Sequence, residues 1–397
     1  MIPRRKAHTL KGELSLCVKS MLSRSRAIPF YKDRWRDKFA NFIDVKHAIS
    51  VSSGREGMRL ILGSLGLNAN DEVIMPAYTL KELAGIIESL GLKAVSADID
   101  PHTFNISPES IAKRINKKTK VILATHIFGV PCRIDEVLDI ARVRSIFVIE
   151  DCAHSLGSKF KGRQTGSFGD AAFFSFETIK LVNTYGGGMV VTNNDKIAGR
   201  ILDAVSIVQE KSRLPLKKLI MTRLENYLLP TSFSLPILYL LASSYWHKRA
   251  YSFYRRLQGS LGVKGSWSDF QAFIGIEKLG TLEERVSRRR AQAALLSSLV
   301  NNKIKTQQVP EGSIPNYYFF VCLVPDNLWQ VRKFLLMHGI DAGIESEIAD
   351  DCCNYSGANS CPHAAEVFKS AMQIPLHEGM SEPDIRYVAA MLNKFFS

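Results

Sequence analysis

The sequence predicts an α/β protein with a mostly parallel sheet that is covered by helices on both faces. From about residue 46, short apolar runs alternate with helical patterns, which is the order of elements in a parallel sheet. The candidate site residues lie at the carboxyl ends of predicted strands, beyond which such sheets bind their ligands. With 397 residues, of which 46% are apolar, we expect a large three-layer α/β/α domain and a smaller C-terminal α/β domain.

The large domain is expected over residues 45–262. Before it lies a basic N-terminal arm, residues 1–44, which we expect to be helical and to pack on the body or on a partner. Apolar runs predict strands at 47–52, 72–76, 93–97, 120–124, 146–150, 171–174 and 188–192. Helical patterns lie at 55–66, 80–90, 108–115 and 134–144. An apolar insertion is expected at about 205–262.

The smaller domain is expected over residues 263–397. It begins with a long amphipathic helix at about 267–299. A strand at 317–324, a helix at 328–338 that ends at Gly339, and a closing helix at 382–396 follow.

The segment 227–246 has 20 residues without a charge and is flanked by basic residues. This length would just span a bilayer, but Pro230, Pro236 and several serines argue against a membrane helix. A buried or subunit-interface insertion is the favoured interpretation. Contact with a membrane surface and a transmembrane helix stay open.

Charge and cysteine content narrow the function classes. Lys and Arg outnumber Asp and Glu by 52 to 38, which gives a net charge of +14. No basic block is interleaved with aromatic residues, so nucleic-acid binding is not expected, and the excess favours an anionic substrate, an anionic cofactor or a membrane surface. Scattered cysteines and the lack of an apolar leader predict a cytoplasmic protein. No metal is predicted, because the spacing of structural zinc ligands is missing from Cys352, Cys353, Cys361 and His363.

An amine, a carboxylate and a hydroxyl at predicted strand ends together indicate pyridoxal phosphate chemistry. Lys180 follows a strand-like run that contains Ser175 and precedes the glycines that begin at Gly186, and Asp151 ends an earlier strand. Such an amine forms a Schiff base with this cofactor, the carboxylate keeps the ring nitrogen protonated, and the hydroxyl binds a phosphate oxygen. We expect Lys180 and Asp151 to be catalytic. Asp151 could instead be a helix N-cap.

Two further groups are candidate cofactor contacts. Gly54 and Arg55 open a helix after a strand, where backbone amides and the positive helix end would face a phosphate; a plain β–α connection is the other interpretation. His154 would contact the phenolic oxygen or cover the ring, although a lone histidine is often structural.

These residues stand in motifs that resemble those of the DegT/DnrJ/EryC1/StrS sugar aminotransferases, a branch of the fold-type I pyridoxal phosphate enzymes. The motifs lie at 71–79, 98–100, 125–129, 150–155, 175–180, 268–272 and 374–377. The resemblance implies a fold-type I homodimer that uses pyridoxal 5'-phosphate. It also implies the transfer of an amino group from an amino acid to a keto-sugar, with glutamate as the expected donor. Related sugar 3-dehydratases have histidine at the position of the lysine, and Lys180 argues against that activity.

The departures from the family pattern surround the predicted cofactor and substrate. Leu80 replaces an aromatic residue that stacks on the ring, Arg55 replaces a threonine, and Lys264 aligns with an asparagine that reaches the phosphate across the dimer. The added cations suggest an acidic acceptor, and 8-dehydro-3-deoxy-manno-octulosonate for lipopolysaccharide is the expected one. A nucleotide-linked 3- or 4-keto sugar for surface polysaccharide is the alternative. A non-catalytic, membrane-associated interaction protein is the alternative from another class.

Overall fold

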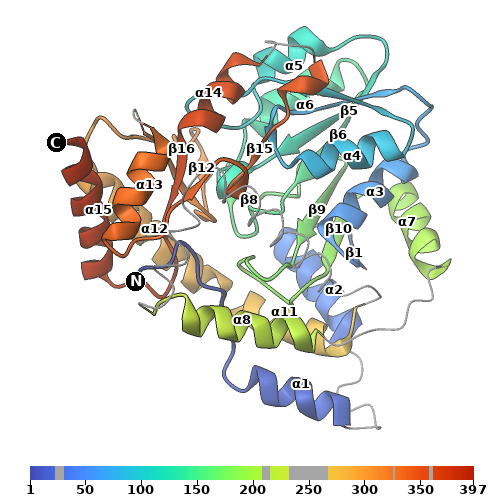
Figure 1. Cartoon of the computed structure of the whole chain (residues 1–397). Helices are drawn as coiled ribbons and strands as arrows, with labels where there is room; N and C mark the ends of the chain where they lie inside the picture. The colour runs from blue at the N-terminus through green and yellow to red at the C-terminus, as the bar shows by residue number, and fades with distance from the viewer. Residues whose placement is uncertain (23–30, 208–214, 232–266, 325–326, 357–360) are drawn as a thin grey trace.

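A seven-stranded sheet forms the centre of the large domain (Figure 1). The computed structural model describes residues 1–22, 31–207, 215–231, 267–324, 327–356 and 361–397. The strand order is β1-β10-β9-β6-β5-β2-β4. The bounds are β1 (His47–Val51), β2 (Glu72–Pro76), β4 (Lys93–Ala97), β5 (Thr119–Thr125), β6 (Phe147–Asp151), β9 (Ala171–Ser175) and β10 (Gly188–Thr192).

The sheet is mostly parallel, as the sequence predicts. Neighbours from β9 through β6, β5 and β2 to β4 run parallel, whereas β10 is antiparallel to both β1 and β9. The predicted strands agree with these bounds to within a residue or two, because strands buried on both faces appear in a sequence as continuous apolar runs.

Helices cover both faces of this sheet (Figure 1). Because successive strand residues point to opposite faces, Val73 and Met75 pack with α3, α4 and α7, whereas Ile74 packs with α5 and α6. Farther along this second face, α2 and α11 pack on β9 and β10. The bounds are α2 (Tyr31–Ile43), α3 (Gly54–Ser64), α4 (Lys81–Ser89), α5 (Pro108–Arg114), α6 (Ile134–Arg142), α7 (Asp195–Ile207) and α11 (Asp269–Gly280).

The C-terminal part contains a second, four-stranded sheet in the order β11-β13-β16-β14. The single helix expected at 267–299 is wrong: α11 ends at Gly280 and α12 begins at Leu282, because Thr281 leaves helical geometry (φ −104°, ψ 3°). The bounds are β11 (Lys305–Thr306), β13 (Phe320–Leu323), β14 (Gly343–Ile344), β16 (Ala371–Ile374), α12 (Leu282–Leu299), α13 (Leu328–Met337), α14 (Pro362–Ser370) and α15 (Glu382–Phe396).

Short elements connect the two sheets. β15 pairs with β3, and β12 joins the β7–β8 hairpin, so C-terminal residues lie against the large domain. The bounds are β3 (Tyr78–Thr79), β7 (Lys159–Phe160), β8 (Arg163–Gln164), β12 (Ser313–Ile314), β15 (Asp350–Asp351) and the 3-10 turns η1 (Ile127–Gly129), η2 (Glu345–Glu347) and η3 (Cys353–Ser356).

The first residues of the chain contact the C-terminal part of the molecule. Ile2 forms a parallel bridge with Ile340, and Arg4 forms ion pairs with Asp341 (2.9 Å) and Glu347 (2.6 Å). The chain then reaches α1 (Glu13–Leu22), which lies beside α8 (Leu216–Leu228) at the lower end of Figure 1.

The sequence leaves open whether residues 227–246 contact or cross a membrane. The structure describes residues 227–231 of this segment. Within the described ranges, no helix is both long enough and apolar enough to cross a bilayer. The rest of this segment lies outside the described residues, as does Lys264.

Candidate functional site

The carboxyl ends of β1, β6 and β9 meet at one edge of the large sheet. Val51, at the end of β1, pairs with Gly188, and Gly188 pairs with Ser175 at the end of β9. Asp151 ends β6 and pairs with Phe173 of β9. Residues far apart in the sequence thus come together where α/β sheets bind their ligands.

Lys180 lies in the loop between β9 and β10, which we call the lysine loop (residues 176–187). The loop closes on its first residue, because the Phe176 carbonyl accepts hydrogen bonds from the amides of Thr184 (3.0 Å) and Gly186 (3.1 Å). The amine Nζ of Lys180 lies 4.6 Å from the centre of the Tyr318 ring. The loop therefore directs the lysine toward the C-terminal part of the chain.

Burial lowers the pKa of Lys180 to about 8, against the opposing effect of the carboxylates of Asp151 and Glu177. The cations Arg5 and Arg55 lower this pKa further. A neutral amine is the form that acts as a nucleophile or base, and this pKa leaves part of the amine neutral at pH 7. Lys180 thus has the electrostatic environment that a Schiff-base lysine requires.

Asp151 is buried beside this amine. Burial raises the pKa of its carboxyl group, whereas the amide of Ala153 and the amine of Lys180 act in the opposite direction. Its Oδ1 accepts a hydrogen bond from the Ala153 amide at 3.0 Å. Turns follow Asp151 in the chain, so it is not the N-cap of a helix. A cationic N–H group placed against it would favour the charged carboxylate.

Glu150, the neighbouring carboxylate, has a structural role on the opposite face of the strand. It accepts hydrogen bonds from three amides, each at 2.8 Å, which belong to Gly166, Phe168 and Gly169. It also faces His126 Nε2 at 3.0 Å. Among the described residues, the one cluster with metal-ligating groups is His126, Glu150 and Cys152. Two of these side chains, His126 and Glu150, already have hydrogen-bond partners in the protein.

The start of α3 lies against Ser175. The Ser53 side chain caps the helix by accepting the Glu56 amide, and the first helical residues are Gly54 and Arg55. A Cβ atom on Gly54 would lie 3.1 Å from the Cβ of Ser175, and one on Gly188 would lie 2.6 Å from the Gly54 nitrogen. Glycine therefore permits a close approach of hydroxyl, helix N-terminus and lysine loop. Such an arrangement suits a phosphate.

His154 lies close to Lys180, whose charge adds to burial in lowering the pKa of the imidazole well below its ordinary value. Its ring stacks on Tyr318, with ring centres 4.4 Å apart. Asn316 fixes this pair, because its side chain donates to the His154 carbonyl (2.9 Å) and accepts from the Tyr318 amide (2.8 Å). Tyr318 was not predicted as a site residue, because the pattern at 317–324 indicates only a strand.

Leu80 immediately precedes α4 and is partly buried among the apolar residues of α3, α4 and α7. The structure brings together the remaining described candidates, which are Gly54, Arg55, Asp151, His154, Ser175 and Lys180. The remaining candidate, Lys264, falls in 232–266, beyond the described residues.

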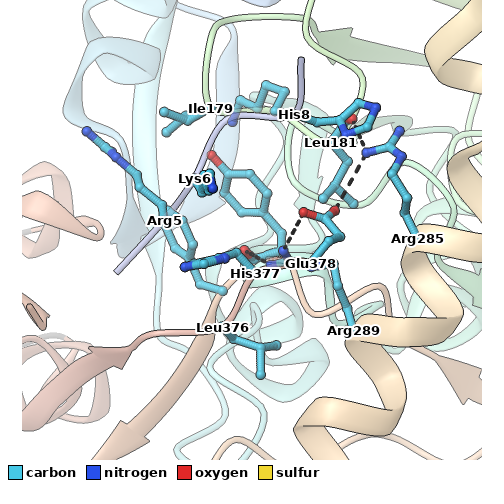
Figure 2. A pocket seen from close by; sticks show the side chains of 13 residues that line it. Arg5, Lys6, His8, Ile179, Leu181, Arg285, Arg289, Leu376, His377 and Glu378 are labelled. Carbon is cyan, nitrogen blue, oxygen red and sulfur yellow. Dashed lines mark hydrogen bonds and ion pairs between the residues drawn. The ribbon is translucent and has the colours of Figure 1, made fainter. Parts of the chain in front are cut away.

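A pocket beside Lys180 is lined by the N-terminal segment, the lysine loop, α12 and the residues after β16. Figure 2 shows Arg5 and Lys6 on one side and Glu378, Arg285 and Arg289 on the other. Residues 1–8 were not predicted to lie at the site. Their contacts depend on partners more than 170 positions away.

The sequence from residue 29 to 393 matches the family model described as the DegT/DnrJ/EryC1/StrS aminotransferase family. The chain belongs to this family. The predicted family is thereby confirmed, and with it the enzyme class, pyridoxal phosphate-dependent sugar aminotransferases.

Several known proteins are similar to this member of the DegT/DnrJ/EryC1/StrS family along nearly the whole chain. The GDP-perosamine synthase of Escherichia coli O157:H7 is 26% identical over 377 residues, which cover 92% of this chain and 90% of that protein. The dTDP-4-dehydro-2,3,6-trideoxy-D-glucose 4-aminotransferase of Saccharopolyspora spinosa is 26% identical and covers 89% and 85%. The aminotransferase TlmJ from Streptoalloteichus hindustanus superposes with a TM-score of 0.79 at 21% identity, covering 100% and 99% of the two chains. The fold-type I prediction is therefore confirmed.

Enzymes of this family use pyridoxal phosphate, and the residues present here fit it. The decisive observation is the close packing of Gly54 and Gly188, where a Cβ atom would lie 3.1 Å from the Ser175 Cβ and 2.6 Å from the Gly54 nitrogen, so that the start of α3 lies next to the hydroxyl of Ser175. On the other side stand a buried carboxyl group and an amine of lowered pKa, at Asp151 and Lys180. These are the groups that the phosphate, ring nitrogen and aldehyde of the cofactor need.

Proposed function

We propose that the chain transfers an amino group from glutamate to a nucleotide-linked 3- or 4-keto sugar, for a surface polysaccharide or lipopolysaccharide. The observation that carries the proposal is the placement of Lys180, Asp151 and Ser175 at one sheet edge, beside the start of α3. The names of the similar proteins support the acceptor class, because they refer to GDP-linked and dTDP-linked sugars.

The proposed roles follow from the environment of each residue. Bound pyridoxal phosphate supplies the carbonyl carbon that takes up the amino group and the ring that accepts electrons. Lys180, partly neutral at pH 7, accepts the proton from the donor's α-carbon and later returns one to the acceptor carbon. Asp151 holds the proton on the ring nitrogen. Ser175 and the amides of Gly54 and Arg55 hold the phosphate, where the Arg55 cation adds attraction.

The octulosonate acceptor has weaker support. It rests on the +14 net charge and on the cations Arg55 and Lys264, and a nucleotide diphosphate is anionic as well. The similarity to enzymes of nucleotide-linked sugars therefore favours the nucleotide-linked acceptor. Both substrates belong in the test.

We also propose that the chain forms a homodimer and is located in the cytoplasm, a location that the scattered cysteines support. The support is an exposed apolar stripe on α8, where side chains at helical spacing are 41–75% exposed; they are Ile220, Met221, Leu224, Tyr227 and Leu228. Such a stripe favours a protein partner. Sedimentation velocity measures the dimer directly, and sedimentation with anionic vesicles tests the membrane-surface alternative.

The experiment that tests the proposed function is an absorption spectrum of the purified protein with and without glutamate. We expect a visible band at roughly 400–430 nm that glutamate shifts toward the ultraviolet, and the loss of this response in Lys180→Ala. Amination is then followed by mass spectrometry with GDP- and dTDP-linked keto sugars and with the octulosonate. A protein that stays colourless with added pyridoxal phosphate would refute the enzyme assignment for this chain.

A further inference from the structure

A buried ion pair links α1, near the N-terminus, to α11, which contacts the lysine loop. The carboxylate Oε1 of Glu13 lies 2.8 Å from the amine Nζ of Lys278, and both side chains are 0% exposed. Glu13 begins α1, and Lys278 lies near the end of α11. Glu13 also precedes residue 29, where the match to the family model begins.

Both members of the pair hold the lysine loop directly. Lys278 donates to the carbonyl oxygen (2.9 Å) and to the side-chain oxygen (2.8 Å) of Asn183. The second oxygen of Glu13 accepts the hydroxyl of Tyr185 at 2.9 Å. The pair therefore contacts the loop at two positions that follow Lys180.

Tyr185 is the strained point of this loop. Its φ of 62° lies in the left-handed region, which a bulky residue adopts only when its surroundings fix it. The surroundings here are the bond to Glu13, the Lys278 ammonium 4.8 Å from the ring centre, and complete burial. The Glu13–Lys278 pair thus stabilises the backbone conformation that closes the loop.

We infer that Glu13 and Lys278 are positioning residues for Lys180. The inference rests on the proposed role of Lys180 as the cofactor lysine. Neither residue lines the pocket beside Lys180, and the main charges that act on its amine are Asp151, Glu177, Arg5 and Arg55. The pair therefore acts on Lys180 through the geometry of the loop, with no direct electrostatic contact.

The test compares four variants with the wild-type holoenzyme: Glu13→Gln, Lys278→Met, the double variant, and Lys93→Met as the control. Lys93 also pairs with a buried glutamate, Glu72 at 3.0 Å, but far from the loop. Three quantities are measured: the dissociation constant for pyridoxal phosphate, the pH midpoint of the visible absorption band, and the melting temperature.

The single variants are expected to bind the cofactor at least about tenfold more weakly and to shift the pH midpoint, whereas Lys93→Met changes neither. The double variant distinguishes positioning from stability. Removing both charges leaves no unpaired buried charge, so the melting temperature recovers in part. The carbonyl of Asn183 still lacks its donor, so weak cofactor binding and the shifted midpoint persist.

A wild-type dissociation constant and pH midpoint in the double variant would overturn the inference and leave the pair a purely structural contact. The double variant still provides this test in the case that the single variants do not fold. Failure of the proposed function would look different, because the wild-type protein itself would then not bind pyridoxal phosphate.

Discussion

Replacing Asp151 with asparagine is expected to lower the pKa of Lys180 further, below its value of about 8 in the cofactor-free protein. The carboxylate of Asp151 is the strongest influence that raises this pKa, and asparagine removes its charge while keeping its size. Arg55→Ala is expected to have the opposite effect, because the Arg55 cation lowers the pKa of Lys180.

The magnitude follows from the difference between the ordinary lysine pKa of 10.5 and about 8. It corresponds to about 3 kcal/mol, and it makes roughly one amine in ten neutral at pH 7 instead of roughly one in 3,000. The folded pKa lies below the unfolded one, so the folded protein binds fewer protons between these values. Burial of the charged amine therefore costs stability in full below pH 8, and this cost disappears as the pH rises toward 10.5.

The assay is pulse labelling of the cofactor-free protein with an amine-acylating reagent at a series of pH values, read by peptide mass spectrometry. Exposed lysines in the same sample report the reagent's own pH dependence. The labelling midpoint of Lys180 is expected near pH 8 in the wild type, lower in Asp151→Asn and higher in Arg55→Ala. A wild-type midpoint near 10.5, or an upward shift in Asp151→Asn, would refute the reasoning.

Three further predictions concern the frame of the site. Gly188→Ala should weaken pyridoxal phosphate binding at least about tenfold, since its Cβ would meet the Gly54 nitrogen at 2.6 Å. Gly63→Ala serves as the control, because a Cβ there would have nothing within 4 Å. Equal cofactor titration curves for the two variants would contradict the phosphate site predicted at Gly54, Gly188 and Ser175. Glu150→Gln should destabilise the fold by about 3 kcal/mol in urea unfolding, because the carboxylate holds three amides and faces His126; an unchanged midpoint would exclude that role. Trp35→Ala should cost about 3–5 kcal/mol, since the ring is fully buried and stacks on Trp267 at 5.8 Å; a loss below about 1 kcal/mol would contradict the packing argument.

Local patterns predicted the features that depend on local physics. Most strands of the large sheet are buried on both faces, so apolar runs in the sequence marked them. Asp151 and Ser175 stood out at strand ends, and Lys180 in the loop that follows Ser175. The direction of β10 was not predictable, because an apolar run is the same for parallel and antiparallel neighbours. The break between α11 and α12 was not predictable either, because no proline at or next to Thr281 marks it.

Long-range pairing accounts for the parts of the site that were missed. Tyr318 reaches His154 from the C-terminal part of the chain, and Asn316, which fixes both, contacts a carbonyl 162 positions away. The Glu13–Lys278 pair is separated still further. Side chains of this kind carry no signal of periodicity or spacing, since their partners are set by the folded topology alone.

The N-terminal segment has a consequence for how the protein is made. Residues 1–13 are translated before the rest of this sequence, yet their contacts include Asn226, Lys278, Ile340 and Glu347, which are translated much later. During synthesis this segment has to wait until most of the chain has been translated. We therefore expect nascent chains that stop before Lys278 to lack the two hydrogen bonds that its amine donates to Asn183, and full capacity for the cofactor to arise only after Lys278 has been translated.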